Sequence, residues 1–410
     1  MILKILSIFV AALMVNRAVW FTPDFGNFHY VLIAISLALL LVLSGKHISV
    51  SFSGIILILV CAISILVNDI PDFFRPWSRL GIFSVTIFLV GPFINGSILM
   101  KFRKMVFWYV QYLFVAITLL SLIGRFTGLS KFQGGYWCGV TTHSMLLGMI
   151  AANTTIFLLY ELVSRPDVRG KARIALSGSL FISLLLVMGA GSRAAFLACV
   201  AGISVFCYMA FQQHRKKFIK FFLPALLVLF CTYQIWDPFL DQIRRKNNND
   251  LTTLNLNTRE SLWEKNWESF KENPVFGVGF ASIEVEPRAF QGFSESSGQV
   301  ETGSSWLTVL SMTGILGGIC IASIMLMTTA QLRRITGAKN HVGAFLTGLL
   351  VFYCVHMCAE GYIFAGGSVA FFNFWLLLGA IFAYDNFERI EPAKIMNSQS
   401  TTSLAGSALA

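Results

Sequence analysis

The fold is decided by two apolar runs that are joined by three residues. Residues 174–190 read IALSGSLFISLLLVMGA, residues 191–193 read GSR, and residues 194–211 read AAFLACVAGISVFCYMAF. Neither apolar run contains a charged residue, and each approaches the length of about 20 apolar residues that a membrane-spanning helix needs. The pattern predicts two antiparallel helices that cross a bilayer and meet in a tight turn.

Runs of this kind recur along the chain, which is 56% hydrophobic and 12% charged, with a mean hydropathy of +0.71. Soluble domains carry about 25% charged residues. Twelve candidate spans lie near residues 2–20, 29–45, 52–68, 80–100, 105–124, 138–160, 174–190, 194–211, 218–236, 303–330, 342–358 and 364–384. The sequence predicts an all-α polytopic membrane protein with about 12 transmembrane helices and disfavours a soluble enzyme.

The charge of the loops sets the orientation. With the N-terminus in the cytoplasm, the cytoplasmic segments hold 18 of the 31 Lys and Arg residues and five acidic residues. The outer segments hold 12 basic and 15 acidic residues. Because cytoplasmic loops of membrane proteins are rich in Lys and Arg, we expect both termini in the cytoplasm. This bias also explains the net charge of +11 without a nucleic-acid partner.

The chain then divides into four parts. Residues 1–236 hold transmembrane helices 1–9, residues 237–302 form one large outer loop, and residues 303–391 hold helices 10–12. Residues 392–410 are rich in Ser, Thr and Ala, a composition that predicts a disordered cytoplasmic tail.

Metal and cofactor motifs are not evident. The eight cysteines lie in or beside apolar runs, where cysteine serves as a small buried side chain. Cys354, His356 and Cys358 are too few to hold a metal ion. The chain has no Walker loop, dinucleotide fingerprint or Gly-x-Ser-x-Gly elbow. We expect neither a metal nor a cofactor, so an activated substrate on the outer side would have to supply the energy.

The large outer loop, expected to contain short helices, has one clear helical segment. It opens with TRESLW at residues 258–263 and should end before Asn273-Pro274. Four of its side chains recur at three- and four-residue spacing and share a helix face: Arg259, Trp263, Trp267 and Phe270. Two interpretations stay open. The segment is an amphipathic helix on the membrane surface, or a lid that brings an arginine into a site at the membrane boundary.

Arg193 is the clearest charge at the outer membrane boundary. It follows Gly191-Ser192 at the start of an apolar helix, so its guanidinium and the exposed backbone N–H groups of the helix point to one place. Both kinds of donor suit phosphate or pyrophosphate. The alternative is an arginine that only extends to lipid headgroups.

Glu301 stands where the tenth helix enters the membrane from the outer side. A carboxylate in this position can act as a general base towards a substrate hydroxyl. It can also stabilise the helix start, together with Ser304 and Ser305. Both interpretations stay open.

Four further residues on the outer side are candidates for substrate contact: His143, Arg75, Arg79 and Trp263. His143 lies near the start of the sixth helix, where a purely structural role is the alternative. Arg75 and Arg79 flank Pro76-Trp77 and could also meet an anionic lipid. Glu360, between the last two helices, is a weaker candidate.

Taken together, these motifs resemble the Wzy/WaaL family of bacterial O-antigen polymerases and O-antigen ligases. The resemblance rests on TRESLW at 258–263, NPVFGVG at 273–279, and the stretch from Ser305-Trp306-Leu307 to TGILG at 313–317, in this order around a large outer loop. The Gly-Ser-Arg turn at 191–193 and the segment around His143 are also similar to the family pattern.

The resemblance implies a metal-independent, inverting glycosyltransferase of the bacterial inner membrane. The donor would be an oligosaccharide on undecaprenyl pyrophosphate at the periplasmic face, with Arg193 and Arg259 on the pyrophosphate. A base would deprotonate the acceptor hydroxyl, which attacks the anomeric carbon. The implied partners are this lipid-linked oligosaccharide, membrane lipids, a flippase and a chain-length regulator.

One departure from the family pattern favours polymerase over ligase. Ligases of the family have a His-Asn pair before the helix that follows the loop, whereas this chain reads ETGS at 301–304, with Glu301 as the nearest base. The sequence therefore predicts a polymerase for exopolysaccharide or O-antigen, with ligation to lipid A core as the alternative. A 12-helix transporter or lipid flippase is a second alternative, although the two halves show no symmetry. A membrane protein without catalysis would leave the outer arginines unexplained.

Overall fold

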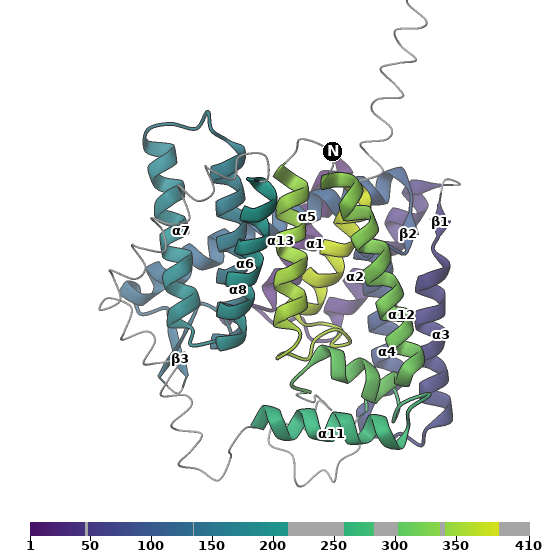
Figure 1. Cartoon of the computed structure of the whole chain (residues 1–410). Helices are drawn as coiled ribbons and strands as arrows, with labels where there is room; N and C mark the ends of the chain where they lie inside the picture. The colour runs from purple at the N-terminus through teal and green to yellow at the C-terminus, as the bar shows by residue number, and fades with distance from the viewer. Residues whose placement is uncertain (46–47, 134, 212–257, 283–301, 337–340, 385–410) are drawn as a thin grey trace, which may run out of the picture.

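A computed structural model describes residues 1–45, 48–133, 135–211, 258–282, 302–336 and 341–384 (Figure 1). Helices form almost all of the regular structure in these ranges. They are α1 (Ile2–Asn16), α2 (Phe28–Ser44), α3 (Phe52–Val67), α4 (Pro76–Val90), α5 (Ser97–Thr127), α6 (Ser144–Ser164), α7 (Lys171–Gly189), α8 (Arg193–Ala210), α11 (Thr258–Glu272), α12 (Ser305–Thr336), α13 (His341–His356) and a last helix, Val369–Tyr384.

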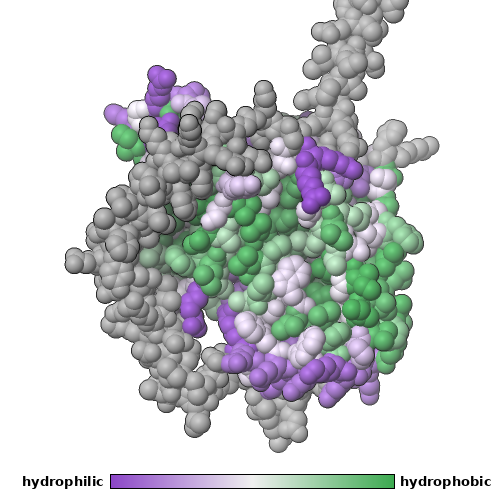
Figure 2. Space-filling model, in the orientation of Figure 1, coloured by the Kyte–Doolittle hydropathy of each residue, from purple (hydrophilic) through white to green (hydrophobic). Residues whose placement is uncertain are grey.

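Six of these helices are long and apolar enough to cross a membrane, and five shorter ones are also apolar. This confirms the prediction of an all-α polytopic membrane protein. The ninth expected span, 218–236, lies outside the described residues. Figure 2 shows a broad hydrophobic surface between hydrophilic residues at two opposite ends of the molecule, as lipid contact requires.

The loops that were expected on opposite sides of the membrane lie at opposite ends of the helices (Figure 1). One end has the N-terminus and the short ribbon of β1 (Ser49–Val50) with β2 (Ile94–Asn95). The other end has α11 and the hairpin of β3 (Lys131–Gln133) with β4 (Tyr136–Gly139). We call this second end the outer end.

The fourth and fifth expected helices, 80–100 and 105–124, have different bounds in the structure. The chain leaves α4 at Gly91 and enters α5 at Ser97. Arg103, which loop charge counting assigned to the cytoplasmic loop, is fully buried within α5. Its Nε donates to the Leu89 carbonyl oxygen at 3.0 Å and its Nη2 to that of Phe88 at 2.9 Å. Arg103 therefore satisfies last-turn carbonyls of α4 that have no partner within the helix.

The turn after α11 packs backbone against backbone on a kink in α12. Gly277 (φ 69°) and Gly314 (φ 62°) both have left-handed backbones. A Cβ on Gly277 would lie 2.5 Å from the Ser311 carbonyl oxygen, and one on Gly314 would lie 2.2 Å from that of Val275. Only glycine fits at these two positions. The glycine motif at 273–279, within the outer loop, and the one at 313–317, in α12, therefore form one junction, which fixes the end of α11.

Two backbone hydrogen bonds close this junction. The Val278 N–H donates to the Ser311 carbonyl oxygen, and the Ile315 N–H donates to that of Pro274, each at 2.8 Å. Asn68, at the end of α3, donates from its side chain to the Gly277 carbonyl oxygen at 3.0 Å. The junction thereby ties the outer loop, at the end of α11, to α12 and to α3.

Candidate functional site

The helix α11 begins and ends where the sequence predicted, at Thr258 and before Asn273-Pro274. It lies across the outer end of the helices rather than alongside them (Figure 1). The side chains that it buries are Leu262, Asn266 and Ser269. The expected face differs, because Trp263 and Trp267 are 38% and 44% exposed. Spacing alone identified a shared face but not the face that packs on the protein.

Two polar side chains of α11 hold it to the start of α12. Asn266 donates to the Thr302 carbonyl oxygen at 2.9 Å and accepts from the Ser311 hydroxyl at 2.8 Å. The Trp263 indole N–H donates to the Gly303 carbonyl oxygen at 3.0 Å. The indole N–H of Trp263, a predicted substrate contact, is thus used to position α11, while much of its ring remains exposed.

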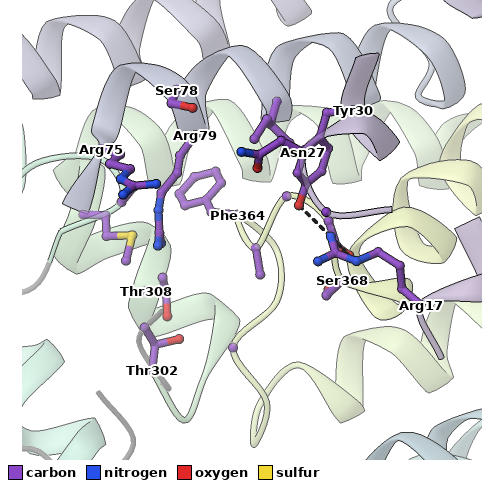
Figure 3. A pocket seen from close by; sticks show the side chains of 18 residues that line it. Arg17, Asn27, Tyr30, Arg75, Ser78, Arg79, Thr302, Thr308, Phe364 and Ser368 are labelled. Atoms are coloured by element: carbon purple, nitrogen blue, oxygen red, sulfur yellow. Dashed lines mark hydrogen bonds between the residues drawn. The ribbon is translucent and has the colours of Figure 1, made fainter. Parts of the chain in front are cut away.

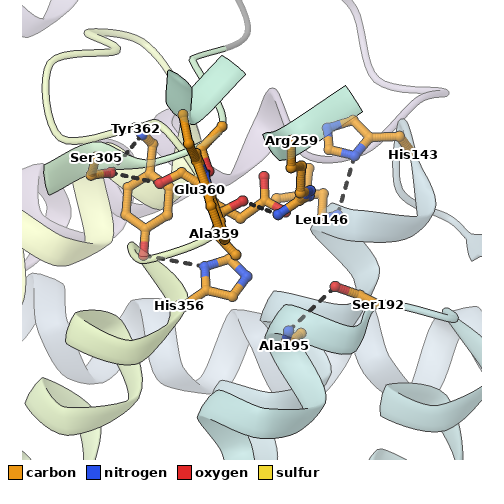
Figure 4. Close-up of polar contacts among 12 residues, drawn as sticks. His143, Leu146, Ser192, Ala195, Arg259, Ser305, His356, Ala359, Glu360 and Tyr362 are labelled. Carbon is orange, nitrogen blue, oxygen red and sulfur yellow. Dashed lines mark hydrogen bonds and ion pairs between the residues drawn. The ribbon is translucent and has the colours of Figure 1, made fainter. Parts of the chain in front are cut away.

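Arg259 extends from the first turn of α11 to the connection between α13 and the last helix. Its guanidinium donates to the Ala359 carbonyl oxygen and forms an ion pair with the Glu360 carboxylate (Figure 4). The side chains of the pair are 31% and 14% exposed, so both are partly shielded from water. This placement supports the interpretation of α11 as a lid that brings Arg259 to the outer end.

The backbone around Glu360 is fixed by Ser305, the first residue of α12. The Ser305 hydroxyl donates to the Glu360 carbonyl oxygen at 2.7 Å and accepts from the Tyr362 N–H at 2.9 Å. The Tyr362 hydroxyl in turn hydrogen-bonds His356 Nδ1 at 3.2 Å. Burial raises the pKa of the Tyr362 hydroxyl well above its ordinary value. Figure 4 shows this chain of contacts from Ser305 through Tyr362 to His356.

The Gly-Ser-Arg turn places Arg193 at the outer start of α8, as predicted. Ser192 caps the helix, because its hydroxyl accepts from the Ala195 N–H at 3.3 Å. Gly191 (φ 63°) allows the turn to approach Tyr136, whose ring would lie 2.6 Å from an added Cβ. Arg193 is the first residue of α8, and α8 packs on α13. Arg193 therefore lies at the end of α8 near the connection after α13, which contains Glu360.

His143 caps α6, since its Nδ1 accepts from the Leu146 N–H at 3.2 Å. This contact supports a structural role for one of its two ring nitrogens. Figure 4 shows His143 in the same region as Arg259 and Ser192. His143, the Arg193 turn and the Arg259–Glu360 pair therefore all lie at the outer end.

Arg75 and Arg79 also lie at the outer end, where both line a cavity of about 390 Å³ (Figure 3). A third arginine, Arg17, joins them. The first expected span, 2–20, includes Arg17, but α1 ends at Asn16 and Arg17 lies at its outer end. Thr302 lines the same cavity. Its neighbour Glu301 lies outside the described residues.

Two residues at the outer end, Glu360 and Arg17, are not evident from the sequence as main site residues. Both are single charged residues in short loops next to apolar helices, and only the tertiary fold shows what they face. Within the described ranges, no three His, Cys, Asp or Glu side chains are close enough to hold a metal ion.

The comparison with protein families agrees with the resemblance found in the sequence. Residues 178–322 match a family model described as O-antigen ligase. The matched segment contains Arg193, Arg259 and the Gly277–Gly314 junction, and it confirms the resemblance to the Wzy/WaaL family. No curated protein matches the chain.

Proposed function

We propose that this chain, a multi-pass membrane protein in which residues 178–322 match a family model described as O-antigen ligase, is a polysaccharide polymerase. It would join oligosaccharide repeat units carried on undecaprenyl pyrophosphate, at the periplasmic face of the bacterial inner membrane. The observation that supports this most is the Arg259–Glu360 pair. A loop helix brings a cation to a carboxylate at the outer end.

Arg193 and Arg259 are the proposed ligands of the donor pyrophosphate. A guanidinium matches the geometry of phosphate oxygens and keeps its charge at every physiological pH. At the start of α8, the backbone N–H groups add a further attraction for anions. In the described state Arg259 contacts Glu360, so an arriving pyrophosphate would compete with Glu360 for the guanidinium.

The reaction that this arrangement supports is an inverting substitution. A carboxylate accepts the proton of the acceptor hydroxyl, whose oxygen attacks the anomeric carbon of the donor. The bond from that carbon to the pyrophosphate oxygen breaks, and the lipid pyrophosphate leaves with the electron pair. The arginines stabilise the charge that develops on the leaving group. Glu301 is the proposed base, and Glu360, the ion-pair partner of Arg259, is a second candidate for this role.

A ligase that transfers the glycan to lipid A core remains the second candidate, because the matching family model is described as O-antigen ligase. The stretch ETGS at 301–304 favours polymerase, since it offers a carboxylate where family ligases have a His-Asn pair. In the polymerase pathway, a flippase would deliver the lipid-linked units and a chain-length regulator would limit the product.

Analysis of lipid-linked glycans in a deletion strain tests the proposal. A polymerase predicts that polymer is lost and that single lipid-linked repeat units accumulate. A ligase predicts that polymer still forms on the lipid carrier but is not transferred. Unchanged glycans in the deletion strain would contradict both and favour a transporter or flippase.

A further inference from the structure

The arginine-lined cavity is not lined by Arg259 or Glu360, although it lies at the same end of the molecule. We call it the arginine cavity. Its charged lining residues are Arg17, which follows α1, Arg75, which precedes α4, and Arg79, one helical turn further on. None of the described lining residues is acidic. Three positive side chains around a cavity of about 390 Å³ suit an anionic group of ligand size.

A buried hydroxyl in the wall gives independent support for a ligand. Thr302 is 4% exposed, and its Oγ1 has no hydrogen-bond partner among the described residues. Figure 3 shows its side chain among those that line the cavity, on the same side as Thr308. A hydroxyl removed from water without a partner is unfavourable. The Thr302 oxygen packs against Gly361 in the cavity wall, so a ligand oxygen would satisfy it once the wall shifts to admit the ligand.

A second, mainly apolar groove adjoins the arginine cavity. The groove, about 290 Å³, lies between α2 and α4 and shares three lining residues with the cavity: Tyr30, Ser78 and Ile82. Its other lining residues are Val31, Ile33, Ala34, Gly81, Val85 and Thr86. Gly81 is exposed, and a Cβ there would meet no atom within 4 Å. The groove is therefore open to the surface at Gly81 of α4.

We propose that the arginine cavity and this groove together bind a membrane lipid with a phosphate and a net negative charge, with the phosphate among Arg17, Arg75 and Arg79 and the hydrocarbon chain between α2 and α4. The basic cavity alone would suit any small anion. The adjoining apolar groove suits a ligand that has a charged head and a hydrocarbon tail.

The site lies next to the Arg259–Glu360 pair. Gly361 follows Glu360 and lines the arginine cavity, and a Cβ on Gly361 would lie 1.8 Å from Thr302 Oγ1. The two sites thus share a wall made of Gly361 and Thr302. The role of the arginine cavity and groove in the reaction rests on the proposed function. This lipid site would hold the carrier lipid of the acceptor glycan, while Arg193 and Arg259 hold the carrier lipid of the donor glycan.

Lipid binding to the full-length protein in phosphatidylcholine nanodiscs tests the site. The probes are undecaprenyl phosphate, phosphatidylglycerol and inorganic phosphate, with bound lipid counted by native mass spectrometry. The variants are the double substitution Arg75→Gln with Arg79→Gln, Gly81→Trp to fill the groove, and Gly81→Ala as its matched control. Arg259→Gln reports on the other site. As a control, the unfolding temperature of each variant is measured. A variant that unfolds at the same temperature as the wild type has kept its fold.

The expected result is a loss of about tenfold or more in lipid affinity for the double arginine variant, since it removes two charged contacts to phosphate. Gly81→Trp should weaken binding similarly, whereas Gly81→Ala and Arg259→Gln should retain this lipid. Wild-type affinity in both the double arginine variant and Gly81→Trp would overturn the proposal. The proposal would also be overturned if inorganic phosphate displaced the lipid at an equal concentration, because the groove would then contribute nothing to lipid affinity.

The choice of lipid distinguishes its role. Preference for undecaprenyl phosphate supports a site for a carrier lipid of the reaction. Preference for phosphatidylglycerol supports the lipid site itself and contradicts its role in holding the acceptor. Both readouts are binding measurements, so they stand apart from the glycan analysis that tests the proposed function.

Discussion

The guanidinium of Arg259 forms an ion pair with the carboxylate of Glu360, which lies 101 residues further along the chain. One partner belongs to a helix of the outer loop and the other to the connection after α13. Because Ser305 hydrogen-bonds the Glu360 backbone, the pair also joins α11 to the start of α12. The loop helix is thereby held over the outer end with its arginine directed at a carboxylate.

Replacement of Arg259 should abolish polymer formation. In Arg259→Ala the donor pyrophosphate loses a proposed charged contact, and loss of one such contact in a transition state typically costs about 10²–10³ in rate. Lys271→Ala removes a cation from the last turn of the same helix and should leave polymer unchanged. The measurement is the length distribution of surface polysaccharide at matched protein levels. Normal polymer in Arg259→Ala would contradict the pyrophosphate assignment.

Substitutions of Arg193 and of Ser192 should have different effects, one on catalysis and the other on stability. Arg193→Ala should lose polymer with a normal amount of protein in the membrane. Ser192→Ala removes only the cap of α8 and should lower stability by about 1 kcal/mol while activity remains. Thermal unfolding and glycan analysis of the two variants provide the test. Loss of activity in Ser192→Ala alone would show that the turn, not its arginine, matters.

Glu301 and Glu360 should respond differently to loss of charge. Glu301→Gln removes the proposed base and should lower the rate by about 10²–10⁴. Glu360→Gln keeps an oxygen that can accept from Arg259, so a smaller loss is expected. Rates of both variants are compared on the same lipid-linked substrate. The opposite order would assign the base to Glu360, and full activity of Glu301→Gln would leave that residue only as a helix cap.

The Gly277–Gly314 junction should be intolerant of any side chain. Gly277→Ala and Gly314→Ala each force a Cβ against backbone atoms at less than normal contact distance, in a left-handed conformation. We expect α11 to detach, with faster proteolysis of the outer loop and loss of polymer. Gly178→Ala is the control, since a Cβ on this helical glycine of α7 meets nothing within 4 Å. Equal protease resistance of the three variants would contradict the role of the junction.

Arg103 should matter for stability rather than for catalysis. Arg103→Met fills a similar space but leaves the Leu89 and Phe88 carbonyl oxygens without this donor. Hydrogen bonds from charged groups contribute about 1.5–3 kcal/mol each. We expect a lower unfolding temperature in detergent, whereas Lys101→Met, at an exposed position of α5, should have little effect. An unchanged unfolding temperature for Arg103→Met would show that these carbonyls need no partner.

Hydropathy predicted the class of fold well but divided two helices wrongly. Residues 91–96 read GPFING, and their apolar character continues that of the flanking spans. Hydropathy therefore gives little sign of the break between α4 and α5, which depends on backbone conformation and on Arg103. The bounds of α11 were predicted correctly, because a cap and a proline mark its ends locally.

The candidate site was predicted in part for a similar reason. Arg193 and Arg259 lie in local motifs, a tight turn and a helix start, which can be recognised in the sequence. Glu360 and Arg17 gain their importance from neighbours far along the chain: Glu360 from Arg259, and Arg17 from Tyr30 and Gly367. Such contacts depend on how the helices pack, and a single sequence does not contain that information.

The most direct test of the proposed polymerase function is polymerisation by the purified protein. The protein is placed in liposomes with undecaprenyl-pyrophosphate-linked repeat units isolated from the deletion strain, without lipid A core. We expect lipid-linked dimers and longer chains of the repeat unit to appear with the wild-type protein and not with Arg259→Ala. Repeat units that stay single until lipid A core is added, and are then transferred to it, would contradict the polymerase assignment.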